Sequence, residues 1–371
     1  MTSVAIQVDQ LFYRVPGGIG TYVRRLLPAL RAASPELDLS VFHSRFARAV
    51  PEELEDLRGV QLERGIRSLY PMWNWSGRPP LPSPLDRPDV IHAPSPVAVP
   101  PVREGQRLVV TVHDLAFRLY PDAYPLAWGL LHRSGFRRAL RAASAIIAVS
   151  RSTASDIAHL GGLDEGSIHV VPLGGSFPVG SEDPSSLLDG LGVPRPYILF
   201  VGTLEPRKNP LRLIRAYRRI ASRVPHALVL AGPMGWRSDP VRRELAGSGP
   251  GSIVVTGRVS EPELDALHRG ADAFVYPSLY EGFGLPVLDA MARGVPVVTS
   301  DTSSLPELAG DAAVLVDPGS TAAIAEGLER VLSDEGDRSR LAAAGLARAR
   351  TFTWDRTARE TLEVYERALA S

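Results

Sequence analysis

One segment of the chain combines glycines, carboxylates and a helix start in a way that suits a bound anion. It reads Glu281-Gly282-Phe283-Gly284-Leu285-Pro286-Val287-Leu288-Asp289. Proline suits the first turn of a helix, and glycine lets backbone N–H groups approach an anion at the positive helix end. Two carboxylates then flank the anion, which suits a nucleoside diphosphate sugar, because that ligand has hydroxyl groups on both sides of its phosphates. The alternative is that Glu281 caps the helix and Asp289 lies on a solvated face.

A pair of cations follows another apolar run. Arg207 and Lys208 come shortly after residues 197–201, and Lys208 is the single lysine of the chain, whereas the other 40 basic residues are arginine. A compact ammonium group can point at a diphosphate without the planar geometry of a guanidinium. Since the chain has no D-x-D pair and no His/Asp cluster with metal-ligand spacing, we expect no metal site and assign charge neutralisation to these cations. The alternative is a solvated charge pair.

Glycines and polar residues also follow the apolar runs of the first half: Gly17, Gly18, Gly20, His113, Asp114, Ser150 and Arg151. The glycines precede a helix, so their amides could bind a phosphate or an acceptor hydroxyl, or form a simple strand-to-helix turn. A histidine at a strand end could bond a sugar hydroxyl or transfer a proton. It could equally be a core histidine with satisfied hydrogen bonds.

Alternating strands and helices must position these residues. The expected strands are 3–8, 39–42, 89–92, 108–113, 145–149 and 167–171, then 197–201, 227–231, 252–256, 273–276, 296–299 and 313–316. The expected helices are 19–33, 126–143, 152–160, 210–223, 262–269, 286–293 and 321–332. Val, Ile and Leu runs joined by helices predict parallel strands buried on both faces, so the fold class is α/β with two doubly wound domains. Ligands bind at the carboxyl ends of such strands, and two facing ligand edges would enclose a cleft.

Composition marks the domain boundary. Residues 172–196 are rich in Gly, Pro, Ser and Asp, which is typical of a linker. We therefore expect a first domain over 1–176, a linker over 177–195 and a second domain over 196–352. The polar and proline-rich stretch 70–88 is expected to be a long surface loop.

Length and charge exclude several classes of protein. The 371 residues are enough for two domains, and 41 basic and 41 acidic side chains cancel. The neutral balance argues against a nucleic-acid binder, and the absence of cysteine excludes disulfides and thiolate sites. No apolar run reaches the roughly 20 residues of a membrane span, and residues 1–8 lack a signal pattern, so we expect a cytoplasmic protein.

Residues 118–141 mix apolar side chains with Arg133, Arg137, Arg138 and Arg141. A basic amphipathic helix of this kind could rest on anionic lipid, as a peripheral contact at the inner face of a membrane, and would fit a lipid-linked acceptor. The alternative is an ordinary covering helix with a solvated arginine face.

Four segments together resemble a known family: Gly17-Gly18-Ile19-Gly20, Thr111-Val112-His113-Asp114-Leu115, Val201-Gly202-Thr203-Leu204-Glu205-Pro206-Arg207-Lys208-Asn209 and Glu281-Gly282-Phe283-Gly284-Leu285-Pro286. Over nearly its whole length the chain is similar to the family 4 retaining glycosyltransferases, which are group 1 glycosyltransferases, and to the bacterial mannosyl- and rhamnosyltransferases among them. The resemblance implies the GT-B fold, in which two Rossmann-like domains face a central cleft. It also implies a C-terminal helix over 353–371 that crosses back onto the first domain.

The resemblance implies roles for individual residues as well. Glu281 would hold the donor sugar and His113 would reach the sugar and the acceptor, so these two are the catalytic candidates. The donor diphosphate would contact Gly18, Arg207, Lys208, Gly282, Phe283, Gly284 and Leu285. The ribose and base would contact Asp289, Arg258 and Val259. The acceptor side would include Gly17, Asp114, Ser150 and Arg151.

Enzymes of this family need no metal or other cofactor, and they transfer a hexose from a nucleotide sugar with retention at the anomeric carbon. The resemblance alone makes GDP-mannose the first choice of donor. The acceptor stays open between a glycan, a lipid-linked glycan and a small molecule. The family's E-x₇-E pattern ends in glutamate where this chain has Asp289, and the shorter side chain could weaken ribose binding.

Three other functions stay open. A sugar-nucleotide 2-epimerase of the same fold would need acid and base carboxylates facing C2 of the sugar. A non-catalytic subunit that binds nucleotide sugars is compatible with Asp289. An NAD-dependent oxidoreductase is disfavoured because Gly17-Gly18-Ile19-Gly20 lacks the full G-x-G-x-x-G spacing.

Overall fold

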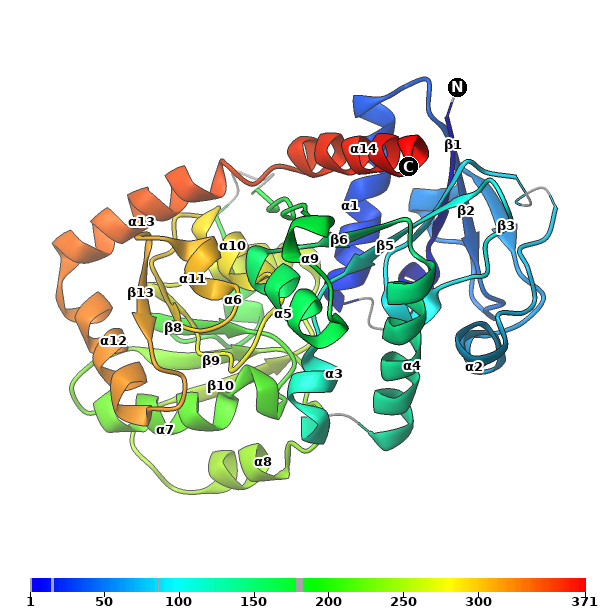
Figure 1. Cartoon of the computed structure of the whole chain (residues 1–371). Helices are drawn as coiled ribbons and strands as arrows, with labels where there is room; N and C mark the ends of the chain where they lie inside the picture. Colours follow the sequence, from blue (N-terminus) through cyan, green and yellow to red (C-terminus); the bar gives the residue numbers. More distant parts are fainter. Residues whose placement is uncertain (1, 15–16, 84, 86, 124, 178–182) are drawn as a thin grey trace. The chain divides into compact units, whose positions relative to one another are not determined.

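The computed structural model describes residues 2–14, 17–83, 85, 87–123, 125–177 and 183–371. Contacts divide the chain into two compact units, Met1–Gly174 with Thr353–Ser371, and Gly175–Phe352. Each unit contains one parallel sheet with flanking helices (Figure 1). The α/β fold class is therefore confirmed for both halves of the chain. Pro16 of the glycine-rich turn, Tyr124 and residues 178–182 of the expected linker lie outside the described residues.

The first unit holds a seven-stranded sheet in the order β3-β2-β1-β4-β5-β6-β7. The strands are β1 (Ser3–Gln7), β2 (Asp38–His43), β3 (Arg58–Gln61), β4 (Val90–Ala93), β5 (Arg107–Val112), β6 (Ala145–Ala148) and β7 (Ile168–Val170). Neighbouring strands pair in parallel, with Val4 opposite both Leu39 and Val90. The chain therefore leaves β1 in one direction along the sheet and returns at β4 in the other, which makes this pair the topological switch point.

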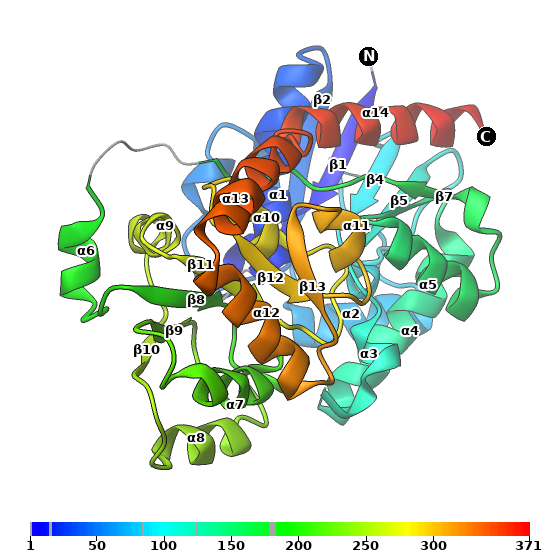
Figure 2. The same ribbon diagram turned by 90° about the vertical axis from the view of Figure 1, so that its left-hand side faces the viewer.

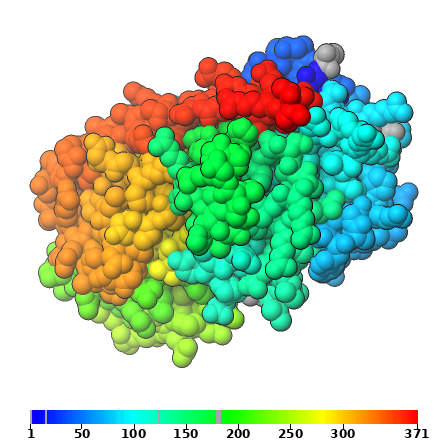
Figure 3. All heavy atoms as spheres, in the orientation of Figure 1, coloured from blue at the N-terminus to red at the C-terminus, as the bar shows by residue number. Residues whose placement is uncertain are grey.

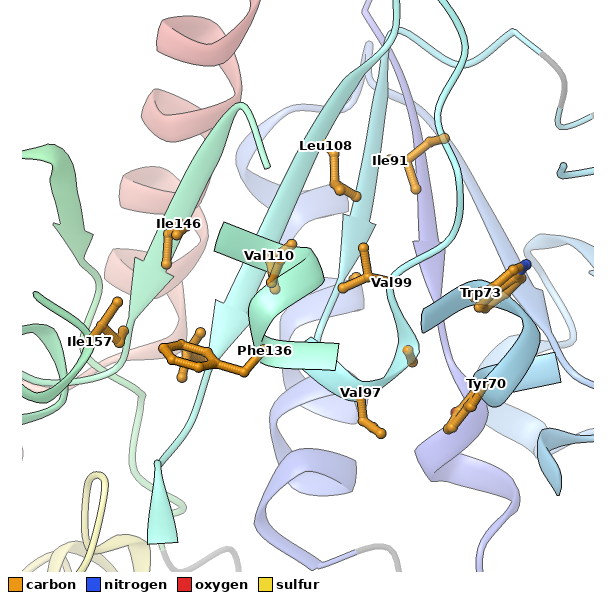
Figure 4. Close-up of a cluster of buried hydrophobic side chains, with 14 of the residues drawn as sticks. Tyr70, Trp73, Ile91, Val97, Val99, Leu108, Val110, Phe136, Ile146 and Ile157 are labelled. Atoms are coloured by element: carbon orange, nitrogen blue, oxygen red, sulfur yellow. The ribbon is translucent and has the colours of Figure 1, made fainter. Parts of the chain in front are cut away.

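Strand alternation sends the side chains of this sheet to two different layers. Ile91, Leu108 and Val110 join a buried cluster that includes Trp73 and Phe136 (Figure 4). The helices on that face are α2 (Ile66–Ser76) and α4 (Leu126–Ala142), with the short helices α3 (Ala116–Leu119) and η3 (Pro96–Ala98) beside α4. The alternate residues of the same strands, such as His92 and Val109, point to the opposite face of the sheet.

The opposite face of the first sheet is covered by α1 (Gly17–Ala33) and α14 (Trp354–Ala370), which pack against each other (Figures 1 and 4). Helix α5 (Arg151–Gly161) follows β6, and the single turns η1 (Asp9–Phe12), η2 (Glu52–Leu54), η4 (Pro121–Ala123) and η5 (Glu165–Ser167) complete the unit. Helices α1, α4 and α14 have 17 residues each. Across the described parts of the chain, no helix has both the length and the apolar composition needed to cross a bilayer.

The second unit holds a six-stranded sheet in the order β10-β9-β8-β11-β12-β13, seen from another side in Figure 2. Its strands are β8 (Tyr197–Val201), β9 (Ala227–Ala231), β10 (Ile253–Gly257), β11 (Ala273–Tyr276), β12 (Val297–Ser300) and β13 (Ala313–Val316). Its helices are α6 (Ser185–Gly190), η6 (Pro206–Lys208), α7 (Pro210–Ile220), α8 (Asp239–Ala246), α9 (Glu261–Arg269), α10 (Leu285–Met291), α11 (Leu305–Ala309), α12 (Thr321–Ser333) and α13 (Glu335–Ala349). Here the switch point lies between β8 and β11.

Two features differ from the sequence-based expectation. The stretch 70–88 does not begin as a surface loop, because α2 runs to Ser76 and buries Tyr70 and Trp73. Strand β3 was missed because its sequence, RGVQ, is an exposed edge strand without an apolar run. Apart from these two differences, residues 183–195, which form the described part of the expected linker after Phe177, contain α6 and are grouped with the second unit.

Gly135 in α4 tests how closely this helix packs against η3. A Cβ atom at this position would lie 2.4 Å from the carbonyl oxygen of Pro96, which is backbone of η3. We expect Gly135→Ala to destabilise the protein by about 1–3 kcal/mol, because the backbone must move. Gly129→Ala in the same helix is the matched control, because it meets nothing within 4 Å and removes the entropic cost of glycine. Urea unfolding measures both variants, and equal stability would contradict this packing.

Candidate active site

Two loops meet at the switch point of the second sheet, one after β8 and one after β11. Asn209 joins them: its backbone is left-handed, with φ of 61°, and its buried amide Nδ2 donates to the carbonyl oxygens of Pro277 at 3.0 Å and Pro318 at 2.7 Å. The backbone N–H of Leu279 donates to the carbonyl oxygen of Arg207 at 2.8 Å. The position of Arg207 and Lys208 is therefore tied to the segment that carries Glu281.

A close backbone approach fixes the start of the β8 loop. A Cβ at Gly232, after β9, would lie 2.1 Å from the carbonyl oxygen of Gly202, after β8. Both glycines have φ of 151°, a conformation that other residues rarely adopt. The loop after β9 can lie this close to the loop after β8 only because Gly232 has no Cβ.

Glu281 is the centre of the site. Its Oε1 atom accepts hydrogen bonds from Lys208 Nζ at 2.5 Å, Ser278 Oγ at 2.7 Å and Tyr276 Oη at 3.1 Å. Arg207 Nη1 lies 3.2 Å from the same oxygen, while Arg207 Nη2 contacts Glu205 at 3.0 Å. These donors all converge on Oε1, which leaves the second carboxylate oxygen, Oε2, outside this set of contacts.

The cluster is buried but electrically balanced. Two carboxylates, Glu205 and Glu281, face two cations, Arg207 and Lys208, and every one of these side chains is at most 13% exposed. Burial alone would raise the pKa of Glu281, but Lys208 and Arg207 outweigh it and lower that pKa to about 2. Burial lowers the pKa of Lys208 and raises the pKa of Glu205.

The backbone around Glu281 is held in place by two serines. The N–H of Glu281 donates to Ser303 Oγ at 3.0 Å, and Ser304 Oγ donates to the carbonyl oxygen of Glu281 at 2.9 Å. The chain then runs through Gly282 and Phe283, whose ring packs edge-on against Phe352 at 5.8 Å. Gly284 is left-handed, with φ of 106°, and precedes α10, so the helix begins at Leu285.

The predicted ribose- and base-binding residues are positioned by elements other than the loops that carry Glu281 and Lys208. Asp289, half-buried in α10, accepts a hydrogen bond from the N–H of Ser176 at 3.1 Å. Arg293 donates to the carbonyl oxygens of both residues, which fixes this corner of the unit. Arg258 and Val259 follow β10, the edge strand, so β9 lies between their strand and β8.

In the first unit, His113 directly follows β5. Its ring hydrogen-bonds the carbonyl oxygen of Pro94, and burial lowers the pKa of His113 to about 4. The edge of the Tyr22 ring packs on it, with the two centroids 4.8 Å apart. Within the described part of the chain, Nε2 of His113 is buried and has no hydrogen-bond partner. A neutral histidine whose Nδ1 donates to a backbone carbonyl has Nε2 as a hydrogen-bond acceptor.

The other predicted residues of the first unit have mixed surroundings. Gly17 is left-handed with φ of 63° and, like Gly18, is exposed at the start of α1. Asp114 Oδ1 accepts from the N–H of Ala116 at 3.0 Å at the start of α3. Ser150 caps α5 through the N–H of Thr153, and Arg151 is the exposed first residue of that helix.

Sequence reasoning did not assign three members of the Glu281 cluster. Glu205 stands two residues before Arg207, while Tyr276 ends β11 and Ser278 follows it. The rule that ligand sites follow strand ends could have identified Ser278. Nothing in the sequence indicates that Tyr276 and Ser278 share one carboxylate oxygen with Lys208.

Comparison with known proteins follows the division into two units. The family model described as Glycosyl transferases group 1 matches residues 190–348, and the model described as Glycosyltransferase Family 4 matches residues 16–174. The chain is 34% identical over 268 residues to O-antigen chain mannosyltransferase B of Escherichia coli, covering 70% of each protein. It is 34% identical over 280 residues to a D-inositol 3-phosphate glycosyltransferase of Xylanimonas cellulosilytica, covering 70% of this chain and 66% of that protein. A match of 32% identity to mannosyltransferase WbdA of E. coli covers 62% of this chain and only 29% of WbdA.

Solved structures share the fold at lower identity. A sucrose-phosphate synthase from Thermosynechococcus elongatus has a TM-score of 0.75 and 20% identity over 100% of both chains. HepE from Anabaena, solved in complex with UDP and glucose, has a TM-score of 0.72 and 19% identity over 98% of this chain and 100% of that one. The fold is that of the GT-B glycosyltransferases, as the resemblance implied.

The chain belongs to the group 1 glycosyltransferases. It is an enzyme of the hexosyltransferase type.

Lys208 is the residue whose removal separates charge from packing in the site. In Lys208→Met we expect the pKa of Glu281 to rise, because only Arg207 is then left to oppose the effect of burial. The acid limb of the kcat/KM profile should shift to higher pH, and donor affinity should fall by about 1.5–3 kcal/mol. Arg219→Met on the exposed face of α7 is the control. An unchanged acid limb together with unchanged donor affinity would remove Lys208 from the site.

Proposed function

We propose that this chain is a retaining, metal-independent hexosyltransferase that uses a nucleoside diphosphate sugar, with GDP-mannose as the first donor to test. The observation that carries the proposal is the buried cluster in which Lys208 and Arg207 hold one oxygen of Glu281 at the switch point of the second sheet. The names of the relatives support the choice of sugar, because two of those described above are mannosyltransferases.

The cluster provides both kinds of contact that such a donor needs. Oε2 of Glu281 would accept a sugar hydroxyl, while Lys208 and Arg207 would balance the diphosphate. Gly282, Phe283, Gly284 and Leu285 would add backbone N–H groups, as in oxyanion stabilisation. Since the cations can neutralise the leaving group, the proposal requires no divalent metal. The carboxylate of Asp289 would bind the ribose in addition to its contact with Ser176.

The reaction would be a front-face displacement. The bond between the anomeric carbon and the diphosphate oxygen breaks, and a bond to the acceptor oxygen forms on the same face of the sugar. The acceptor proton passes to the departing diphosphate oxygen. In this scheme His113 stays neutral, because its pKa of about 4 is far below physiological pH, and its Nε2 accepts a hydrogen bond from the sugar or acceptor.

A donor screen in the presence of EDTA tests this function. Thermal shifts are measured with GDP, UDP, dTDP, ADP, NAD and their common sugar conjugates. A ligand at 100 times its Kd should stabilise the protein by about 2.7 kcal/mol, which corresponds to several degrees. We expect one nucleoside diphosphate to act without metal, and NMR of the glycoside product to show the anomeric configuration of the donor.

Each competing function predicts a different result in the same screen. Stabilisation by NAD alone would favour an oxidoreductase. Conversion of the donor sugar at C2 without an acceptor would favour an epimerase. Donor binding without turnover toward any glycan, lipid-linked or small-molecule acceptor would favour a binding subunit. An inverted product would contradict retention while leaving the transferase class intact.

The proposal includes an anionic membrane surface as a peripheral partner at helix α4. Leu126, Trp128 and Leu130 are 79%, 45% and 51% exposed, and Arg137 and Arg141 continue the face of Leu126 and Leu130 at spacings of four and seven residues. No acidic residue occurs between Asp122 and Asp156. The atoms of this stretch, teal in Figure 3, form part of the visible surface. Exposed apolar side chains beside unopposed arginines suit a bilayer interface better than a purely polar partner.

Vesicle sedimentation tests the membrane contact. We expect binding to phosphatidylglycerol vesicles, weaker binding to phosphatidylcholine vesicles, and a several-fold loss in the double variant Leu126→Ser, Leu130→Ser. The control is Leu187→Ser with Leu315→Ser, which replaces two leucines of 39% and 38% exposure in the second unit. Equal binding by both double variants would contradict a membrane-facing α4.

A further inference from the structure

A chain of buried hydrogen bonds connects the C-terminal helix to the first sheet. Tyr365 of α14 bonds Nδ1 of His92 through its hydroxyl at 2.6 Å. Nε2 of His92 bonds the hydroxyl of Thr111 at 2.8 Å, and that hydroxyl lies 3.1 Å from the hydroxyl of Tyr22. All four residues are at most 2% exposed. We call Tyr365, His92, Thr111 and Tyr22 the α14 network.

The α14 network ends at the proposed active-site histidine. Thr111 and His113 are two residues apart in the β5 segment, so they point to the same face of the sheet. The hydroxyl of Tyr22 hydrogen-bonds both Thr111 and Thr361 of α14. The ring of Tyr22 packs edge-on against His113 at an interplanar angle of 74°. Tyr22 also lies about one turn into α1 beyond Gly18. One network thus contacts both the histidine and the helix that follows the glycine-rich turn.

His92 can only act as a fixed, neutral link. Burial lowers the pKa of His92 to about 3, so at neutral pH one ring nitrogen donates and the other accepts. If Nε2 donates to Thr111, then Tyr365 donates to Nδ1; in the other tautomer Nδ1 donates to Tyr365 and Thr111 donates to Nε2. A network of this kind has few alternative arrangements and holds its side chains rigidly.

Helix α14 is anchored at both ends of the face that it covers. Thr357 Oγ1 donates to the carbonyl oxygen of Pro172 at 2.7 Å, near the start of the helix. Arg107 Nε donates to the carbonyl oxygen of Ala368 at 2.9 Å, near its end. Tyr365 therefore has a defined position over β4 and β5.

We propose that His92 and Tyr365 are positioning residues for His113, so that the C-terminal helix sets the orientation of this ring through Thr111 and Tyr22. The inference rests on the proposed function, in which Nε2 of His113 accepts a hydrogen bond from the sugar or acceptor. It gives α14 a role in the reaction in addition to its role in covering the sheet.

A second buried network in the same unit supplies the control. Tyr70 donates to Asp9 Oδ2 at 2.6 Å and accepts from Gln7 Nε2 at 3.0 Å. Tyr70 is 1% exposed and belongs to the apolar cluster on the opposite face of the sheet. Tyr70→Phe and Tyr365→Phe each remove one buried hydroxyl, but only Tyr365 belongs to the network that reaches His113.

The experiment compares these two variants for kcat, donor affinity and the NMR signals of the histidine rings. For Tyr365→Phe we expect kcat to fall roughly tenfold at unchanged donor affinity, because a small misplacement of a group at the reacting centre is costly. The kcat of His92→Phe should fall further, and the kcat of His92→Gln should be partly recovered. In Tyr365→Phe the ring signals of His113 should shift. For Tyr70→Phe, kcat and these signals should stay as in the unaltered enzyme.

Two outcomes would overturn the inference. One is a Tyr365→Phe enzyme that melts earlier but keeps its kcat and the His113 signals, since its role would then be purely structural. The other is equal loss of kcat in Tyr365→Phe and Tyr70→Phe. The variant His113→Ala distinguishes a failure of this inference from a failure of the proposed function. If His113→Ala leaves kcat unchanged, the role of His113 is wrong, and the NMR comparison alone decides whether Tyr365 orients its ring.

Discussion

A carboxylate as deeply buried as Glu281 can stay ionised only if its surroundings replace the water that it has lost. Lys208, Arg207, Ser278 and Tyr276 do this by converging on a single oxygen. The other features of this edge of the sheet serve that convergence. Asn209 ties the loop after β8 to the loop after β11, and Gly232 lets the loop after β9 approach the loop after β8 closely. Because the pKa of Glu281 lies below its ordinary value, its ionised form stabilises the protein at neutral pH, and this stabilisation is lost as the pH falls through about 2.

The first unit shows what happens when the same constraint is met without cations. Asp9 is fully buried after β1, but its partners are the hydroxyls of Ser44 and Tyr70 and the N–H of Ser44. Burial therefore dominates, and the pKa of Asp9 is raised while that of Glu281 is lowered. Asp9 is held by neutral hydrogen-bond donors, and its contacts connect β1 with the end of β2 and with α2. Glu281, in contrast, has two cations beside it, and the proposed function uses these cations to bind an anionic ligand.

The fold was predictable because most strands are continuous apolar runs, such as Leu108 to Val112, bounded by helices. Prediction from sequence was wrong for α2. This helix contains Pro71 and is followed by a proline-rich stretch, so its buried Tyr70 and Trp73 resembled loop residues. Glu281, Arg207 and Lys208 were each predicted from residue type and position. Their mutual contact was not, since it depends on the loop linkage through Asn209. The bond between His92 and Tyr365 joins residues 273 positions apart, and neither lies in a recognisable motif.

Electrical balance also constrains how the site can bind a diphosphate. Lys208 and Arg207 are not free charges waiting for a ligand, because Glu281 and Glu205 already neutralise them. In the proposed function, an arriving diphosphate would therefore draw the two cations toward itself, which would loosen their hold on Glu281 and free carboxylate capacity for sugar hydroxyls. The net binding energy is the difference between two sets of charge-assisted contacts and is much smaller than either set alone. On this proposal, a ligand that brings both the diphosphate and the sugar would satisfy all the groups at once, whereas a free phosphate or a free sugar would leave part of the cluster uncompensated. The buried charge balance that stabilises the cluster would thus favour the intact nucleotide sugar over its fragments.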